Sequence, residues 1–121
     1  MTSDEFAKNF YIEKQKYVKA YFQAQPEYPS AVNAKIKAMA LPPSEQEKLK
    51  EVIDLLLNDV FYGVLLGLDG EYPIGNTQQT YRIYDEEGNL ISDCGELEVS
   101  AYDYFHGGKY EKEIGIFKEE K

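Results

Sequence analysis

Carboxylates are the residues whose number and spacing could do chemistry in this chain. Between residues 51 and 108 there are twelve Asp and Glu side chains and one cation, Arg82, which gives this stretch a formal charge of −11. Two carboxylates that converge in a cleft can perform acid–base catalysis, and carboxylate oxygens bind hard cations. The acids that could serve in this way are Asp69, Glu71, Asp85, Glu86, Glu87, Glu96, Glu98 and Asp103.

One group of these acids superficially resembles the start of a calcium-binding loop. Asp85, Glu87 and Asn89 alternate as loop ligands do, and Glu96 stands at the twelfth position. The glycine, Gly88, falls at the fourth position, whereas the sharp turn of a calcium loop requires it at the sixth. The internal spacing therefore favours a solvated hairpin turn, and we predict no metal site.

The other residue types that perform catalysis are scarce. His106 is the only histidine and Cys94 the only cysteine, which are too few for a structural zinc site. The Gly-x-Ser-x-Gly elbow of hydrolases and the glycine-rich phosphate loops are absent. A role of His106 at a helix end, near terminal carbonyl groups, is the simpler interpretation. The sequence predicts a protein that is not an enzyme and has no cofactor.

Tyrosines interleaved with the acids indicate a binding surface. Tyrosine offers rigid contact area with a polar end, and carboxylates attract a cationic partner while repelling DNA, RNA and anionic lipid. The alternative is that the tyrosines pack in the core and the acids only keep the chain in solution. If the surface exists, we expect the partner to be a basic protein and the contact residues to be Asp69, Glu71, Tyr84, Asp85, Glu86, Glu87, Glu96, Glu98, Tyr102 and Asp103.

The elements that must position these residues begin with a long helix. Thr2 and Glu5 have the spacing of a capping box, in which each side chain bonds to the backbone amide of the other residue. Aromatic residues then recur at helical spacing, which predicts an amphipathic helix over residues 3–24. Pro26 and Pro29 end this helix because proline lacks an amide donor.

Two more helices are expected before the acidic segment. Ser30 can cap a short helix over residues 31–40, and Ser44 with Glu47 forms a second capping box for a helix over residues 45–68. This third helix is apolar nearly all round, which is typical of a central helix covered on most sides. Its single continuous polar row, expected to be exposed, is Glu51, Asp54, Asn58 and Tyr62.

Glycines mark close approaches and the end of the third helix. Gly63 and Gly67 lie one turn apart, where they allow another element to come near the helix backbone. Gly70 can adopt the left-handed conformation that stops a helix.

The second half changes to the period of β-strands. We predict a β-hairpin over residues 77–92 with its turn at Gly88, and a further strand over residues 113–118 because a hairpin alone is marginal in water. Residues 95–106 fit both a strand and a helix, and the helix is slightly favoured. The expected fold is α+β: N-terminal helices packed on a small C-terminal antiparallel sheet in a single domain over residues 1–121.

The cellular location follows from cysteine usage and hydropathy. A single cysteine cannot form an intrachain disulfide, and the first twenty residues have no apolar run of signal-peptide type. The longest apolar stretch, residues 52–68, contains two Asp residues that are costly in hydrocarbon. We therefore expect a cytoplasmic protein that does not bind membranes.

At the level of class, three segments are similar to the small acidic immunity proteins of bacterial toxin–immunity systems. They are the stretch from Leu55 to Gly70, the hairpin from Tyr81 to Asn89, and Tyr104, Phe105 and His106. The resemblance implies an inhibitor that binds one cognate toxin domain, often a nuclease, and blocks its substrate site. The acidic surface would then replace the phosphates of the nucleic-acid substrate.

Two other classes remain open at this stage. A housekeeping adaptor or small-ligand-binding protein would use the same scaffold with a pocket beside Tyr62. A carboxylate enzyme would need two acids, such as Glu96 and Asp103, converging in a cleft.

Overall fold

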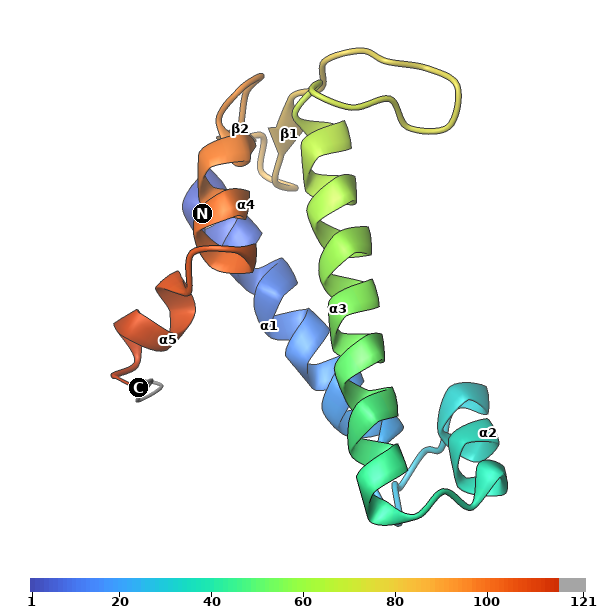
Figure 1. The fold of residues 1–121 in the computed structure, drawn as a ribbon. Coiled ribbons are helices and arrows are strands. Elements are labelled where there is room, and N and C mark those ends of the chain that lie inside the picture. The colour runs from blue at the N-terminus through green and yellow to red at the C-terminus, as the bar shows by residue number, and fades with distance from the viewer. Residues whose placement is uncertain (116–121) are drawn as a thin grey trace.

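Five helices and a two-stranded sheet make up residues 1–115, the part of the chain that the computed structural model describes (Figure 1). Within these residues no helix is both long and apolar enough to cross a membrane. The fold is α+β, as predicted. In chain order the elements are α1 (Ser3–Tyr21), α2 (Ala31–Met39), α3 (Pro43–Leu68), β1 (Ile83–Tyr84), β2 (Leu90–Ser92), α4 (Leu97–Phe105) and α5 (Lys109–Glu113).

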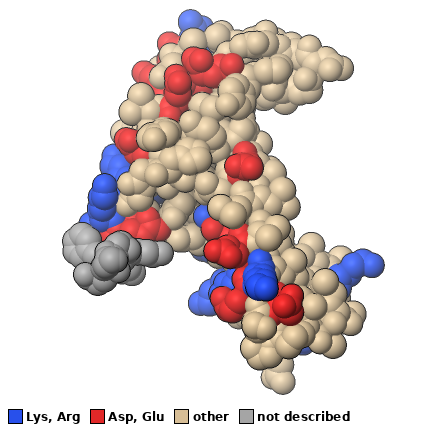
Figure 2. All heavy atoms as spheres, viewed as in Figure 1, with Lys and Arg blue, Asp and Glu red and all other residues tan. Residues whose placement is uncertain are grey.

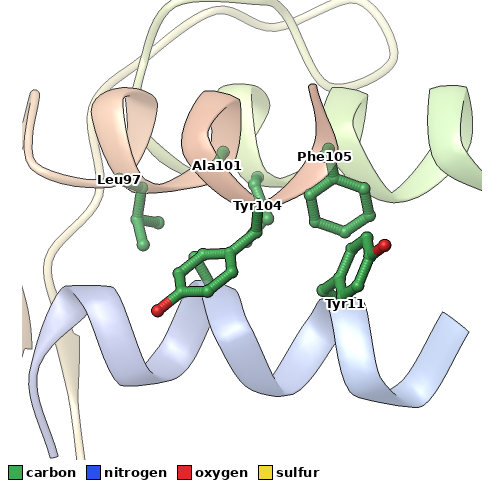
Figure 3. Close-up of a cluster of buried hydrophobic side chains, with 7 residues drawn as sticks. Tyr11, Leu97, Ala101, Tyr104 and Phe105 are labelled. Atoms are coloured by element: carbon green, nitrogen blue, oxygen red, sulfur yellow. The ribbon is translucent and has the colours of Figure 1, made fainter. Parts of the chain in front are cut away.

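The core lies where α1, α3 and α4 contact one another. Leu65 of α3 and Leu97 of α4 are fully buried there. Figure 3 shows Tyr104 reaching from α4 toward α1, while the ring of Tyr11 on α1 meets that of Phe105 edge to face, with 5.3 Å between ring centroids. Helix α4, which comes late in the chain, therefore closes the core formed by the two long helices.

A cluster of hydrogen-bonded polar side chains links α1 to α4 and α5. The Asp4 carboxylate accepts hydrogen bonds from the Tyr104 hydroxyl at 2.8 Å, from the Ser100 hydroxyl at 3.2 Å and from the Lys109 ammonium group at 2.9 Å. Burial alone would raise the pKa of Asp4, but the bonds from Lys109 and Tyr104 outweigh it and lower this pKa. Burial and the negative charge of Asp4 raise the pKa of Tyr104 well above its ordinary value.

Tyr104→Phe is expected to reduce the sensitivity of the fold to alkali. Because folding raises the pKa of Tyr104, this hydroxyl group stabilises the fold fully at any pH below its unfolded pKa of about 10. Above that pH, the stabilisation decreases by about 1.4 kcal/mol for each pH unit. The free energy of unfolding of the wild type should therefore decrease between about pH 8 and about pH 11. In Tyr104→Phe this decrease should be smaller by about 1.4 kcal/mol. Urea titrations measure both values. Tyr28→Phe, at an exposed tyrosine, is the control; an equal fall in Tyr104→Phe and wild type would contradict this role.

Part of the polar row of α3, which was predicted to be exposed, lies against α1 and α4. Lys14 of α1 is almost completely buried, and its ammonium group lies 3.0 Å from Asp54 and 3.3 Å from the side-chain oxygen of Asn58. The Asn58 amide donates to the carbonyl oxygen of Phe105 at 3.0 Å. The polar row expected to be exposed thus turns Asp54 and Asn58 toward α1 and α4, because a buried ammonium group requires oxygen partners.

The outward side of α3 is apolar as a consequence. Leu65 and Leu66 are buried near the end of the helix, whereas further apolar residues along its length face solvent. These exposed residues are Val52, Leu55, Leu56, Val60 and Val64.

The predicted helix starts were confirmed in two of three cases. The Thr2 hydroxyl accepts from the amide of Glu5 at 3.1 Å, and the Glu5 carboxylate accepts from the amide of Thr2 at 2.9 Å. The Ser30 hydroxyl accepts from the amide of Asn33 and caps α2. The capping box at Ser44 was wrong: α3 begins at Pro43 without a side-chain cap, because a proline at the first helical position needs no acceptor and has a preset φ.

Helix α2 is held to the end of α1 by one side chain. Asn33 is buried, and its amide nitrogen lies within hydrogen-bond distance of the carbonyl oxygens of Ala20, Tyr21 and Gln23, at 2.9 to 3.2 Å. These carbonyls lie at the C-terminal end of α1, where helix carbonyls have no partner in the helix. This contact fixes α2 beside the end of α1.

The glycine predictions were partly confirmed. Gly70 has φ +86° and follows α3, as expected for a helix stop. A Cβ at Gly67 would lie 2.7 Å from the Ile74 side chain, so this glycine does allow a close approach. Gly63 has no such neighbour within 4 Å.

The sheet is smaller than predicted. Strands β1 and β2 pair antiparallel, with Ile83 opposite Ser92 and Tyr84 opposite Leu90. Residues 78–82 form no strand, and Thr77 makes only an isolated bridge with Ile74. Residues 71–80 are all exposed, so they have no covered face to favour a regular strand.

The predicted third strand over residues 113–118 was wrong at its start, since Glu113 is the last residue of α5. Residues 116–118 lie outside the described part of the chain. The ambiguous segment 95–106 contains α4, which confirms the slight preference for a helix.

Candidate functional site

Asp69 organises the region where the predicted contact residues lie. It follows α3 directly and is 1% exposed. One carboxylate oxygen accepts from the amides of Gly95 at 2.8 Å and Leu97 at 3.0 Å, and the other accepts from the amide of Glu98 at 3.0 Å. Leu97 and Glu98 are the first two residues of α4, which has no side-chain cap of its own, and Gly95 lies just before the helix. Asp69 therefore caps α4 from a distance and, contrary to prediction, is not part of an exposed binding surface.

The cap brings two exposed carboxylates together. Side-chain oxygens of Asp69, Glu71 and Glu98 lie within 4.8 Å of one another, although Glu98 is distant in sequence. Glu71 and Glu98 are exposed, whereas the oxygens of Asp69 are engaged by backbone amides. The cluster thus presents two carboxylates to solvent, held close by the junction between α3 and α4.

Aromatic side chains continue from this cluster along α4. The rings of His106 and Tyr62 meet edge to face with 4.6 Å between centroids, and the centroid of the Tyr102 ring lies 5.3 Å from that of His106. Burial is the main cause of the raised pKa of Tyr62, and the nearby Tyr72, Glu98 and Tyr102 raise it further. We call this surface the acid–tyrosine face; it consists of Glu71, Tyr72, Glu98 and Tyr102 around Tyr62 and His106.

His106 and Tyr72 were not among the predicted contact residues. Glu98, Tyr102 and His106 are spaced by four residues, which places them on one side of a helix. A helix over residues 95–106 therefore predicts that these three side chains share a face. The backbone amide of His106 bonds to helix carbonyls at the end of α4, as the interpretation of a helix-end residue implied. Its ring packs against Tyr62, the residue beside which the alternative of a small-ligand-binding protein would have its pocket.

The hairpin turn carries three more of the predicted residues. The Asp85 carboxylate accepts from the amides of Glu87 at 3.0 Å and Asn89 at 2.9 Å, and Gly88 has φ +87°. Hydrogen bonds from the Asn89 amide are the main cause of the lowered pKa of Asp85. Asp85 thus stabilises the turn, as the hairpin interpretation required, while Glu86 and Glu87 are exposed beside the exposed Tyr84.

Two predicted residues have other surroundings. The Glu96 carboxylate accepts from the amide of Asp93 at 3.1 Å, and Asp93 in turn pairs with Arg82 at 3.3 Å, so Glu96 belongs to the turn before α4. Asp103 is half-buried and follows Tyr102, which turns it about 100° around the helix, away from the acid–tyrosine face.

Acidic side chains gather at one end of the molecule. In Figure 2 they cluster over the hairpin and the beginning of α4, the end at which α3 also finishes. The charge of the segment from residue 51 to residue 108 is thus divided: Asp54 pairs with Lys14, Asp69 is buried, and the remaining acids of the hairpin and of α4 form the exposed negative surface.

In comparisons with known proteins, no family model, no curated protein and no solved structure matches this chain.

Proposed function

We propose that this chain is an immunity-type inhibitor that binds a basic domain of a cognate toxin through the acid–tyrosine face. The observation that carries the proposal is the convergence of Glu71 and Glu98, two exposed carboxylates, beside the buried Asp69. Three negative groups held this close repel one another. The repulsion is relieved when a Lys or Arg side chain of a partner enters between them, so part of the binding energy is stored in the unbound protein.

The tyrosines supply the contact area that carboxylates lack. Tyr102 and Tyr72 are about half exposed and flank the acids on the same face. Tyrosine is frequent at the energetic centres of interfaces because its ring is rigid and its hydroxyl satisfies hydrogen bonds. A guanidinium group can stack on such a ring while it pairs with the neighbouring Glu98.

The hairpin acids extend the negative surface beyond the contact. Glu86 and Glu87 project from a turn that Asp85 and Gly88 hold in shape. Charges at the edge of an interface increase the association rate of an oppositely charged partner and repel nucleic acid. For a nuclease toxin, the acidic surface would occupy the site that binds substrate phosphates.

Neutralising the two converging acids is expected to abolish capture of the partner. Glu71→Gln combined with Glu98→Gln removes both charges and keeps the side-chain shape, so affinity should fall by at least about tenfold. The measurement is affinity capture from a lysate of the source cell at about 50 mM salt, followed by elution at about 500 mM. A basic protein should be captured by the wild type and lost from the double variant.

The matched control is Glu45→Gln combined with Glu47→Gln. These two exposed acids lie in the first turns of α3, about 36 Å along the helix from Asp69. The control should capture the same protein as the wild type. Capture of no basic protein by the wild type, or equal capture by both double variants, would refute the proposal.

A further inference from the structure

The outward side of α3 is an apolar face with no partner among the described residues. The side chains that form it are exposed by 41% to 60%. Three of its residues, Val52, Leu56 and Val60, follow one another at intervals of four, and Val64 completes a ridge along the helix. Leu55 flanks the ridge, and the exposed carboxylate of Asp59 lies between Leu55 and Leu56 around the helix. Figure 2 shows this side of the molecule hollowed between α2 and the loop after α3, with an acidic group midway along α3.

The size of this face matches what a dimer needs. At these exposures the five residues leave roughly 450 Å² open, within the range of about 300–600 Å² for the largest patch on a monomer, which is often functional. A standard interface buries about 800 Å² per partner, of which about 56–65% is apolar, or about 450–520 Å². The exposed area of the apolar face on one chain therefore equals the apolar area that one partner buries in such an interface.

From this ridge and this area we infer that the apolar face of α3 packs against the same face of a second copy of this chain. An i, i+4 ridge fits between the ridges of an identical helix at a crossing angle of about −50°. With the helices antiparallel about a two-fold axis near residue 58, Leu56 lies opposite Val60 of the other copy, and Val52 opposite Val64. The contact is self-complementary, as a two-fold interface requires.

Two further features agree with a second copy of α3 at this position. Gly63 lies beside the ridge, and a Cβ built on it would meet nothing within 4 Å. It thus leaves room for another backbone, the role that Gly67 plays toward Ile74 inside the chain. The crossing angle also makes the helix ends diverge, which separates the α2 regions and the loops of the two copies.

The dimer contact is distinct from the acid–tyrosine face, and the two respond to salt in opposite directions. Each copy has a net charge of −9, so two copies repel until salt screens them. Dimerisation should strengthen several-fold between about 50 and 500 mM salt, whereas binding of a basic partner should weaken. The inference does not depend on the proposed function.

Sedimentation equilibrium at about 100 µM chain and about 500 mM salt tests the inference. The wild type should have twice the chain mass of 13.9 kDa, and Leu56→Glu and Val60→Lys should each be monomeric. An equal mixture of these two variants should recover dimer, because one contact then pairs Glu with Lys and the other is native. Val99→Glu, at an exposed position on α4, is the control and should dimerise.

Three results would overturn the inference. The first is a monomeric wild type at the same concentration, which would leave the apolar face to a different protein. The second is a dimer that survives Leu56→Glu, which would place the contact elsewhere. The third is a mixture of the two variants that stays monomeric, which would exclude the antiparallel pairing. Circular dichroism of each variant verifies that its helices are intact.

Discussion

Asp69→Ala is expected to lower the free energy of unfolding by about 3–5 kcal/mol, because it leaves three backbone amides near the start of α4 without their acceptor. Each buried donor without a partner costs about 1–3 kcal/mol, and relaxation of the helix end reduces the sum. Amide hydrogen exchange of Leu97 and Glu98 should accelerate more than that of α1. Urea unfolding measures the first effect, and exchange monitored by nuclear magnetic resonance measures the second.

Asp59→Ala is the matched control for this variant, since it removes an exposed carboxylate from α3 and leaves the cap intact. It should change the free energy of unfolding by less than about 0.5 kcal/mol. Similar values for the two variants would mean that Asp69 does not cap α4. The cap also places Glu98 beside Glu71, so Asp69→Ala should weaken partner binding as well as the fold.

Leu65→Ala is expected to cost about 2–5 kcal/mol, whereas Leu56→Ala on the same helix should cost less than about 0.5 kcal/mol in the monomer. Leu65 is fully buried in the core, and truncating it leaves a cavity between α1, α3 and α4. Leu56 is more than half exposed on the outward side. Urea unfolding at low protein concentration, where the chain is monomeric, measures both.

This comparison tests the orientation of α3 directly. If the polar row of α3 were exposed, as its sequence pattern indicates, the outward apolar residues would be covered and Leu56→Ala would be costly. Equal losses for the two variants would therefore contradict the contact of Asp54 and Asn58 with Lys14.

Features that depend on nearby residues could be predicted from the sequence. The capping box of Thr2 with Glu5 and the turn at Gly88 both act within three or four residues, and both are present. Pro26 and Pro29, which were predicted to end the first helix, lie in the segment between α1 and α2. The sequence favoured a helix at α4 only slightly, because apolar and polar residues also alternate along its nine residues as they do in a strand.

The orientation of α3 could not be predicted because it depends on a distant residue. A helix that is apolar on most sides has no single preferred buried face, and Lys14, separated from Asn58 by 44 positions, decides which side turns inward. The start of α3 was misplaced for a local reason, since Ser44 has the right spacing for a cap but Pro43 begins the helix before it.

The candidate site was partly predictable from composition and partly set by one long-range contact. The acids and tyrosines of residues 69–103 indicated a negative surface, and Glu71, Glu98 and Tyr102 do share a face. The burial of Asp69 could not be predicted, because the backbone amides that donate to its carboxylate lie 26 to 29 residues further along the chain. Asp103, which was predicted to belong to the same surface, is half-buried and lies about 100° around α4 from Tyr102.

The most direct test of the proposed function is the salt dependence of affinity for the captured partner, measured by isothermal titration calorimetry between about 50 and 500 mM salt. For the wild type, the affinity should fall steadily as the salt concentration rises, and the variant that combines Glu71→Gln with Glu98→Gln should bind at least about tenfold more weakly at low salt with a shallower slope. An affinity that is independent of salt, or one that the double variant retains in full, would contradict a contact made through the acid–tyrosine face.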